Sequence, residues 1–418
     1  MSQYKPYPAY KDSGVEWLGR VPAHWTIGPY KATIQIENGS DYKDVEADDG
    51  YPVIGSGGPF AYSSKLMYDG ESVLLGRKGT IDKPLYINGA FWAVDTMYWS
   101  VIKPKAHGRF AYYIATTIPF DMYSTNTALP SMTKSVLGSH VVAFPGFEEQ
   151  QSIAGHLDRD TARIDALIEK KTRFIQLLSE KRQALITHAV TKGLDSSVKM
   201  KDSGVEWLGE VPEHWGVKPL KLLVKEESTI SYGIVQPGDP LDEGVPFVQT
   251  TNMSSGDFEI ESLQKTTPEI AAGFPRSRLA GGEVILGIRA SIGAAFVVPK
   301  HLAGVNLSRG VARIDCSSEL SSHFLVAYLS SVAVDGYWQL AKQGSTFNEV
   351  SIATVKELLV PVPPSKEQAD IEGVLSKATA RLNSILNKTE RSIDLLKERR
   401  AALITAAVTG QIDLREAV

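Results

Sequence analysis

The sequence predicts an α+β fold with an internal pseudo-twofold repeat. Two α/β domains are separated by two long antiparallel helices that form a coiled coil. Two observations lead to this prediction. The stretch KDSGVEWLG occurs at 11–19 and again, unchanged, at 201–209. A second match pairs residues 148–195 with residues 366–413 without a gap. Repeats at a fixed spacing indicate a chain built from two copies of one unit.

The repeats divide the chain into six segments. In order, these are an N-terminal repeat block at 1–25, a first variable domain at 26–147, a central long helix at 148–195, a second repeat block at 196–215, a second variable domain at 216–364 and a C-terminal long helix at 365–414. The variable domains match only weakly. LLGRKGTI at 74–81 faces ILGIRASI at 285–292, and AVDTMYWSV at 93–101 faces GVNLSRGVA at 304–312. The change of offset from 211 to 218 predicts seven extra residues in the second copy, between about 313 and 345.

Both long segments carry leucine or isoleucine on a seven-residue period, interrupted once by Lys171 or Thr389, and contain no internal proline. The residues of this predicted helix seam are Leu157, Ile164, Leu178 and Leu185 in the first segment and Leu375, Leu382, Leu396 and Leu403 in the second. A period of seven is typical of a coiled-coil seam. About 40 helical residues would form a rod of roughly 60 Å. The alternative is that both helices belong to an ordinary bundle.

The variable domains have the pattern of compact strand-rich units. Buried strands are predicted in ESVLLGRKGTI and GEVILGIRASIG, and short helices in RFAYYIATT and SSHFLVAYLSSV. Glycine and proline predict loops in YPVIGSGGPFAYSS and SYGIVQPGDPLDEG.

Composition excludes several classes of protein. The single cysteine, Cys316, excludes an internal disulfide framework and a thiolate-rich zinc site. No apolar run reaches the length of a membrane span, and the first residues do not resemble a secretory signal, so a cytoplasmic protein without a membrane partner is expected. The net charge is −4, with a slight acidic excess in the variable domains and a slight basic excess in the long helices. Any DNA affinity should therefore be modest without a partner.

No catalytic motif is present in the sequence. It has no Walker A pattern, no His-Glu-x-x-His, no Cys-x-x-Cys, no glycine-rich SAM loop and no Asn/Asp-Pro-Pro-aromatic motif. His24 and His214 recur beside a tryptophan in the repeat blocks, and we expect them to fix the blocks against the helices. The sequence therefore predicts a chain without catalytic residues or a metal site.

The order of these elements resembles one known family. DSGVEWLGxVPxHW, an EQxxI helix start and an ALITxAVT helix end, in two near copies, are similar to the specificity subunit of a type I restriction–modification system. The resemblance covers nearly the whole chain. It implies that each variable domain is a target recognition domain reading one half of a bipartite site in double-stranded DNA. It also implies two modification subunits that bind SAM and methylate adenine, and restriction subunits that use ATP and Mg²⁺, with no cofactor on this chain.

Two other functions remain open from the residues alone. The chain could be a protein-only coiled-coil scaffold or a self-contained DNA methyltransferase. The missing motifs disfavour the methyltransferase.

Residue type suggests which side chains contact DNA. Arginine and lysine pair with guanine, asparagine and glutamine pair with adenine, and small polar groups bind phosphate. The candidates are Ser56, Arg77, Lys78, Thr80, Ser124, Asn126 and Thr127 in the first domain and Gln249, Asn252, Arg289, Ser291, Arg309, Gln343 and Asn348 in the second. The alternative for each is an ordinary exposed polar residue.

The repeat blocks are predicted to be joints between a helix and a variable domain. The second block follows the first long helix directly, whereas no helix precedes the first block. Pseudo-twofold symmetry would dock the first block on the end of the C-terminal helix and bring the termini together. The expected apolar anchors are Trp17, Trp25, Trp207 and Trp215.

If the two helices set the gap between half-sites, their length should set the DNA spacer. Four residues inserted after Glu180 add about 6 Å of helix, or roughly two base pairs at ~3.4 Å each. Because four residues nearly complete a turn, the seam stays aligned. Sequencing of methylated adenines should show unchanged half-sites and a longer spacer. An unchanged spacer would contradict the prediction.

Overall fold

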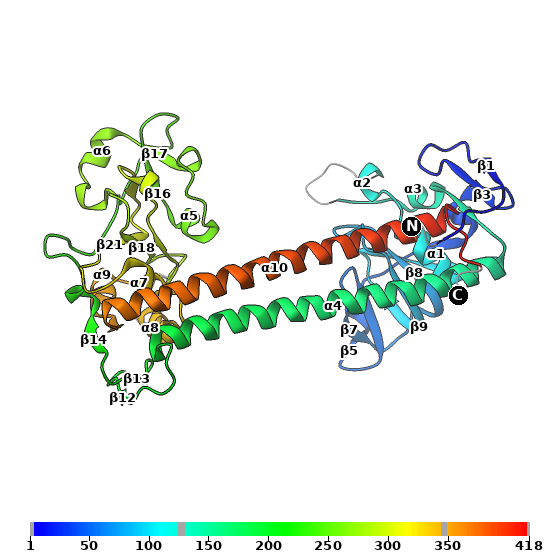
Figure 1. Cartoon of the computed structure of the whole chain (residues 1–418). Coiled ribbons are helices and arrows are strands. Elements are labelled where there is room, and N and C mark those ends of the chain that lie inside the picture. Colours follow the sequence, from blue (N-terminus) through cyan, green and yellow to red (C-terminus); the bar gives the residue numbers. More distant parts are fainter. Residues whose placement is uncertain (1–3, 124–129, 344–348, 416–418) are drawn as a thin grey trace. The chain divides into compact units, whose positions relative to one another are not determined.

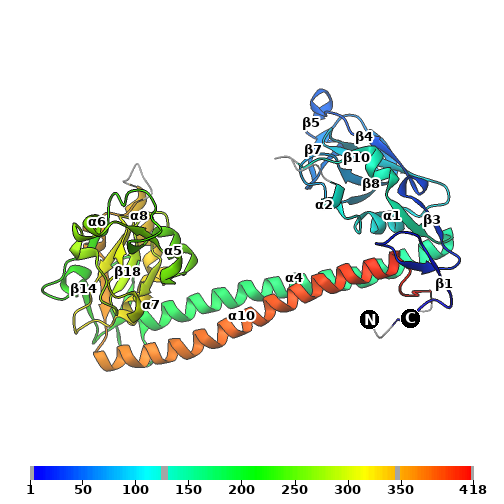
Figure 2. The same cartoon turned by 90° about the horizontal axis from the view of Figure 1, so that it is seen from above.

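The computed structural model describes residues 4–123, 130–343 and 349–415; the side chains of Asp121 and of residues 340–343 are not described. The chain forms two compact units, residues 1–172 with 390–418 and residues 173–389 (Figures 1 and 2). Each unit contains one repeat block, one sheet-bearing domain and part of both long helices. The predicted fold class is confirmed. No helix among the described residues is long and apolar enough to cross a membrane.

The long helices are α4 (Phe147–Lys192) and α10 (Ser365–Val408). Each ends before a glycine of positive φ, Gly193 at +78° and Gly410 at +71°, which is the usual helix stop. Both helices are therefore shorter than the predicted segments, which extend to 195 and 414.

In each unit, the start of one long helix packs on the end of the other. Unit 1 buries Leu157 and Ile164 of α4 with Leu403 of α10, and Arg400 Nε lies 2.8 Å from Asp165 Oδ1. Unit 2 buries Ile186, Ala189 and Val190 of α4 with Ile371 and Leu375 of α10. The two helices therefore run antiparallel. Of the predicted seam, Leu157, Ile164, Leu178, Leu375, Leu382 and Leu403 are buried, and Leu185 and Leu396 are half-buried.

Unit 1 contains a seven-stranded sheet in the order β4-β10-β8-β9-β6-β7-β5. The strands are β4 (Ile34–Asn38), β10 (Met97–Ile102), β8 (Tyr68–Gly76), β9 (Leu85–Ala93), β6 (Tyr51–Gly55), β7 (Gly58–Ser63) and β5 (Glu46–Ala47). Its helices are α1 (Gly108–Ala115), α2 (Phe120–Tyr123) and α3 (Lys134–Ser139). Val73 and Leu75 of β8 pack with α1, whereas Leu74 faces a second cluster. This alternation is what a central strand buried on both faces requires.

Unit 2 repeats this core with smaller sheets, β15-β21-β18-β19 and β17-β16-β20. The strands are β15 (Ser231–Tyr232), β21 (Val311–Ile314), β18 (Val284–Gly287), β19 (Ala295–Val297), β17 (Gln264–Thr266), β16 (Val245–Val248) and β20 (Asn306–Leu307). Its helices are α5 (Thr250–Ser255), α6 (Pro268–Ala272), α7 (Ser322–Leu329), α8 (Val332–Gln343) and α9 (Ile352–Glu357). The helices expected at 109–117 and 321–332 are α1 and α7.

The loop predicted at 51–64 is wrong. The segment forms the hairpin of β6 and β7, in which Gly55 faces Gly58 across a two-residue turn. Gly58 has a φ of +101° in this tight turn, a backbone angle that glycine tolerates because it has no Cβ. The turn glycines therefore join two strands rather than break them.

The sequence alignment of the variable domains is also wrong at one strand. Met97 of β10 faces Gly76, whereas Val311 of β21 faces Gly287. The offset at this strand is thus 214 rather than 211. Three of the seven extra residues precede 311, outside the predicted interval of 313–345, because backbone pairing fixed the register where side-chain similarity was weak.

The repeat blocks form equivalent joints, as predicted. Each block pairs two short strands, β1 (Tyr10–Asp12) with β2 (Arg20–Pro22) and β12 (Met200–Asp202) with β13 (Glu210–Pro212). Each continues into a strand paired with the segment before a long helix, β3 (Thr26–Pro29) with β11 (Val141–Phe144) and β14 (Gly216–Pro219) with β22 (Leu359–Val362). The end of α10 packs against the first block, where a Cβ on Gly410 would overlap Pro22.

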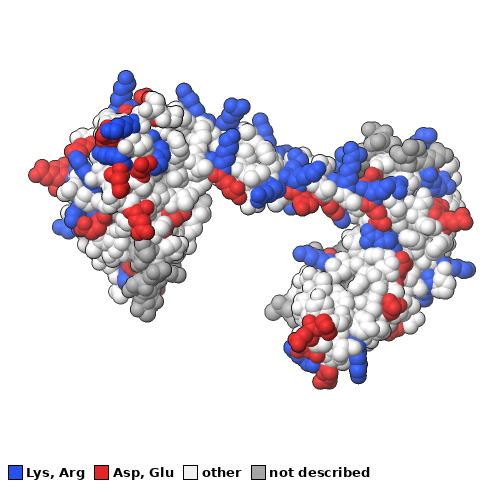
Figure 3. Space-filling model, turned by 90° about the horizontal axis from the view of Figure 1, so that it is seen from below, with Lys and Arg blue, Asp and Glu red and all other residues white. Residues whose placement is uncertain are grey.

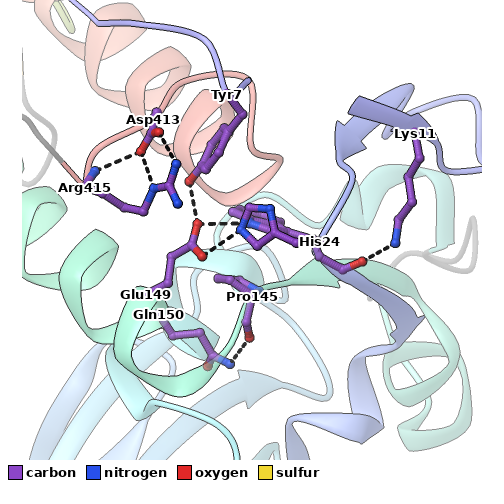
Figure 4. A network of polar contacts seen from close by, with 9 residues as sticks. Tyr7, Lys11, His24, Pro145, Glu149, Gln150, Asp413 and Arg415 are labelled. Carbon is purple, nitrogen blue, oxygen red and sulfur yellow. Dashed lines mark hydrogen bonds and ion pairs between the residues drawn. The ribbon is translucent and has the colours of Figure 1, made fainter. Parts of the chain in front are cut away.

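Glu149, in the first turn of α4, is the centre of the first joint (Figure 4). Its carboxylate accepts hydrogen bonds from Tyr7 Oη at 2.9 Å and Trp25 Nε1 at 3.1 Å, and lies 2.9 Å from His24 Nε2. Burial, followed by the nearby Glu149 charge, raises the pKa of Tyr7. The C-terminal segment closes this joint, because Asp413 N donates to Lys5 O at 2.8 Å.

The second joint has fewer contacts to its glutamate. His214 Nε2 lies 2.8 Å from Glu367 Oε2, in the same way as His24 and Glu149. Trp215 Nε1 is buried and has no partner among the described residues. The expected structural role of both histidines is confirmed.

Two of the four predicted tryptophan anchors are buried. Trp25 and Trp215 are 1% and 0% exposed. Trp17 is 37% exposed and stacks on His140, and Trp207 is half-buried beside Tyr337. Trp207 still packs against the core of unit 2, so the prediction of an apolar anchor is wrong for Trp17 alone among the four.

We expect Glu149→Ala to destabilise the first joint by about 2–4 kcal/mol, since it leaves two buried donors unsatisfied. Glu367→Ala should cost the second joint about 1 kcal/mol, because only the histidine contact is lost. Hydrogen exchange of residues 7–25 and 197–215 measures each joint separately. Glu148→Ala, at the exposed neighbouring position, is the matched control. Equal losses of protection from the two glutamate variants would contradict the prediction.

Candidate DNA interface

Two equivalent loops follow the central strands of the two domains. Residues 77–80 follow Gly76 at the end of β8, and residues 288–291 follow Gly287 at the end of β18. A Cβ on either glycine would overlap the carbonyl oxygen four residues later, Thr80 O or Ser291 O. Glycine is therefore required for each loop to fold back on its own strand.

Each loop is fixed at its tip. Gly79 has a φ of +80°, and its counterpart Ala290 has a φ of +57°, the one positive φ among the described non-glycine residues. Isolated bridges then pair Lys78 with Ser131 and Arg289 with Glu349. Each loop is thus held against the segment that leads into α3 or α9, so its side chains project from a defined backbone.

In the second domain this loop borders a pocket of about 400 Å³. The lining residues are Ile234, Val235, Pro237, Gln249, Thr250, Arg289, Ala290, Ser308, Arg309 and Gly310. Three of the predicted DNA-binding residues, Gln249, Arg289 and Arg309, therefore lie together. The side chains of the two arginines are 45% and 47% exposed, which leaves both guanidinium groups accessible to a ligand.

Gln249 Nε2 itself donates to Gln264 Oε1 at 2.9 Å, and other candidates in the second domain are engaged or buried within the protein. Asn252 Oδ1 accepts from Gln249 N at 2.9 Å and caps α5. The Ser291 hydroxyl is buried and has no hydrogen-bond partner among the described residues. The Gln343 side chain and Asn348 lie outside the described part of the chain.

In the first domain, the 94–96 turn contacts both places that hold the described candidates. Arg77 Nη1 donates to Asp95 O at 3.3 Å, and Lys78 and Thr80 are exposed. Ser56 lies in the β6–β7 turn. The 94–96 turn links these two places, because Val94 N donates to Ile54 O and Arg77 N to Thr96 O. Ser124, Asn126 and Thr127 lie outside the described residues.

Sequence reasoning missed Glu349. Its Oε2 lies 3.9 Å from Arg289 Nε and 3.5 Å from Arg309 Nη2. Glu349 lies 218 residues after Ser131, the same offset that relates the two long helices. The bridges of Lys78 with Ser131 and of Arg289 with Glu349 show that the two residues are equivalent. A lone acid within the stretch NEVS at 348–351 gave no reason to select it.

The described residues offer little acid–base or metal chemistry. They contain no cluster of three or more His, Cys, Asp or Glu that could hold a metal ion. Burial raises the pKa of the Cys316 thiol to about 11, so the thiol is protonated at neutral pH. Figure 3 shows cationic side chains along the long helices and both signs of charge on the domains. The site is suited to binding a polar, anionic ligand.

Comparison with known proteins supports this reading. The family model described as type I restriction modification DNA specificity domain matches residues 30–176 and 229–395. The type I restriction enzyme EcoBI specificity subunit of Escherichia coli is 24% identical over 430 residues, covering 96% of this chain and 89% of the relative.

Solved structures share the fold. A chain from the type I R-M system has a TM-score of 0.73 at 16% identity and covers 94% of this chain and 99% of its own length. The HsdS subunit from Thermoanaerobacter tengcongensis has a TM-score of 0.50 at 13% identity, with 94% and 98% coverage. The prediction of a DNA-recognition subunit is confirmed, and neither a protein-only scaffold nor a self-contained methyltransferase is supported.

We expect Arg289→Ala to weaken binding of target DNA by about 1–3 kcal/mol and to relax one base position, because a guanidinium can form two bonds to guanine. A phosphate contact would instead lower affinity on all sequences and make the salt slope shallower. Binding titrations at several salt concentrations distinguish the two. Arg278→Ala, an exposed arginine outside the pocket lining, is the control. Wild-type affinity, base preference and salt slope would remove Arg289 from the interface.

Proposed function

The chain belongs to the type I restriction–modification DNA specificity family, and we propose that the loops at 77–80 and 288–291 read the two halves of its bipartite target. The observation that carries this proposal is the equivalence of the loops. Each follows a glycine at the end of a central strand and is closed by a bridge, Lys78 to Ser131 or Arg289 to Glu349. Two loops that recognise different half-sites require the same backbone geometry with different side chains.

The second loop carries the chemistry of base recognition. An arginine can donate two hydrogen bonds to guanine, and a glutamine carboxamide can both donate to and accept from adenine. Arg289, Arg309 and Gln249 line one pocket, which gives this half-site reader both kinds of group. In the first domain, Arg77 and Lys78 supply the cations and Thr80 a hydroxyl.

We propose that the chemistry is performed by partner chains. Two modification subunits would bind SAM and methylate adenine, and restriction subunits would use ATP and Mg²⁺ to cleave DNA. This chain would bind none of these cofactors. An adenine within a duplex must be flipped out to be methylated, so the role of this chain is to determine which adenine the modification subunit meets. The long helices offer exposed surface between the joints for such partners. Because its partner is the cell's DNA, we place the chain in the cytoplasm.

Exchange of one domain tests this function. Residues 26–147 are replaced by the equivalent segment of a relative with a different target, and the joints at 1–25 and 196–215 are retained. Methylated adenines sequenced from cells carrying the system should show one half-site changed and the other intact, since the loops lie in different units. A simultaneous change in both half-sites would contradict independent reading.

A further inference from the structure

Glu349 is the acidic member of a three-residue cluster at the pocket of the second domain. Its side chain is 24% exposed, and the same oxygen, Oε2, faces Arg289 Nε at 3.9 Å and Arg309 Nη2 at 3.5 Å. The backbones of all three residues are fixed. Val350 N donates to Ile288 O at 2.8 Å, and Arg309 N donates to Ile234 O at 2.7 Å.

These ion pairs are long and half-exposed. Exposed pairs of this kind contribute little to stability, so they hold the arginines only loosely. One carboxylate also cancels only one of the two positive charges. The cluster therefore keeps a net positive charge, and both guanidinium groups can exchange Glu349 for a stronger acceptor.

The first domain arranges its charges differently. Strand register makes Asp95 the counterpart of Arg309, and Ser131 is the counterpart of Glu349. Arg77 Nη1 donates to the backbone carbonyl of Asp95 rather than to its carboxylate. The acid at the position of Glu349 therefore belongs to the second domain and is replaced by a neutral serine in the first.

We propose that Glu349 is a specificity-determining residue of the second domain. Its carboxylate holds Arg289 and Arg309 over the pocket and opposes binding of the phosphate backbone. Non-target DNA then gains little from the two arginines. A matching half-site offers base acceptors that replace Glu349, so binding becomes strong only on the correct sequence. This inference rests on the proposed reading role of the 288–291 loop.

The test uses the full chain assembled with its modification subunits and two duplexes of equal length, one with the target and one without. Glu349→Gln removes the charge and keeps the shape. We expect about two- to fivefold tighter binding to non-target DNA, the range that a half-exposed ion pair supports. The salt slope should steepen by about one, because one more phosphate is neutralised. The ratio of target to non-target affinity should fall.

Three further variants separate the causes. Glu349→Asp keeps the carboxylate and should restore most of the discrimination. Glu206→Gln makes the same charge change at an exposed position in the second repeat block and should match the wild type. In an Arg289→Ala, Arg309→Ala background, Glu349→Gln should no longer tighten binding, since the groups it opposes are gone.

The outcomes distinguish this inference from the proposed function. If the double arginine variant binds DNA like the wild type, the reading role of the loop is wrong. If that variant binds weakly but Glu349→Gln leaves non-target affinity and salt slope unchanged, only the role of Glu349 is wrong. Weaker binding of both duplexes by Glu349→Gln would also overturn it, because that result indicates a purely structural residue.

Discussion

The packing of a helix end against a repeat block is the contact on which the rest of the structure depends. At each joint a long helix stops before a glycine, Gly193 or Gly410, that lies against a proline and a tryptophan of the block, and at Gly410 a Cβ would overlap the proline. The same block starts the strand that anchors a recognition domain. The direction of each domain on its helix is thus set by a few close apolar contacts and one glutamate–histidine pair. Bulk burial alone would not fix that direction.

The parts of the fold that follow a local period could be predicted from the sequence. The spacing of Leu157, Ile164 and Leu178 in multiples of seven residues depends on helix geometry alone, and all three residues are buried. The repeated blocks at 1–25 and 196–215 then predicted that both joints have the same structure. The β6–β7 hairpin was missed because glycine and proline serve both loops and tight strand turns, and only cross-strand pairing decides between them.

The site could be predicted in part. Residue chemistry selected Arg289, Arg309 and Gln249 without showing that they share a pocket. It also selected Asn252 and Ser291, whose polar groups face a helix end and the protein interior. Glu349 could not be found, because its significance arises from backbone pairing across 60 residues of chain between Arg289 and Glu349. The long helices and the joints could therefore be predicted from sequence periodicity and repetition. The DNA-binding residues could not, because tertiary contacts decide which of them share a pocket.

The contact between the first repeat block and the end of α10 has a consequence for folding during translation. Unit 2 is one continuous stretch, residues 173–389, and can fold as it leaves the ribosome. Unit 1 is discontinuous, since its core joins Trp25 and Leu157 to Leu403 and Leu414. The first repeat block is therefore translated well before the end of α10 that packs on it. Until α10 is made, α1 and the start of α4 can cover only part of the block, and the surface that meets residues 403–414 stays exposed.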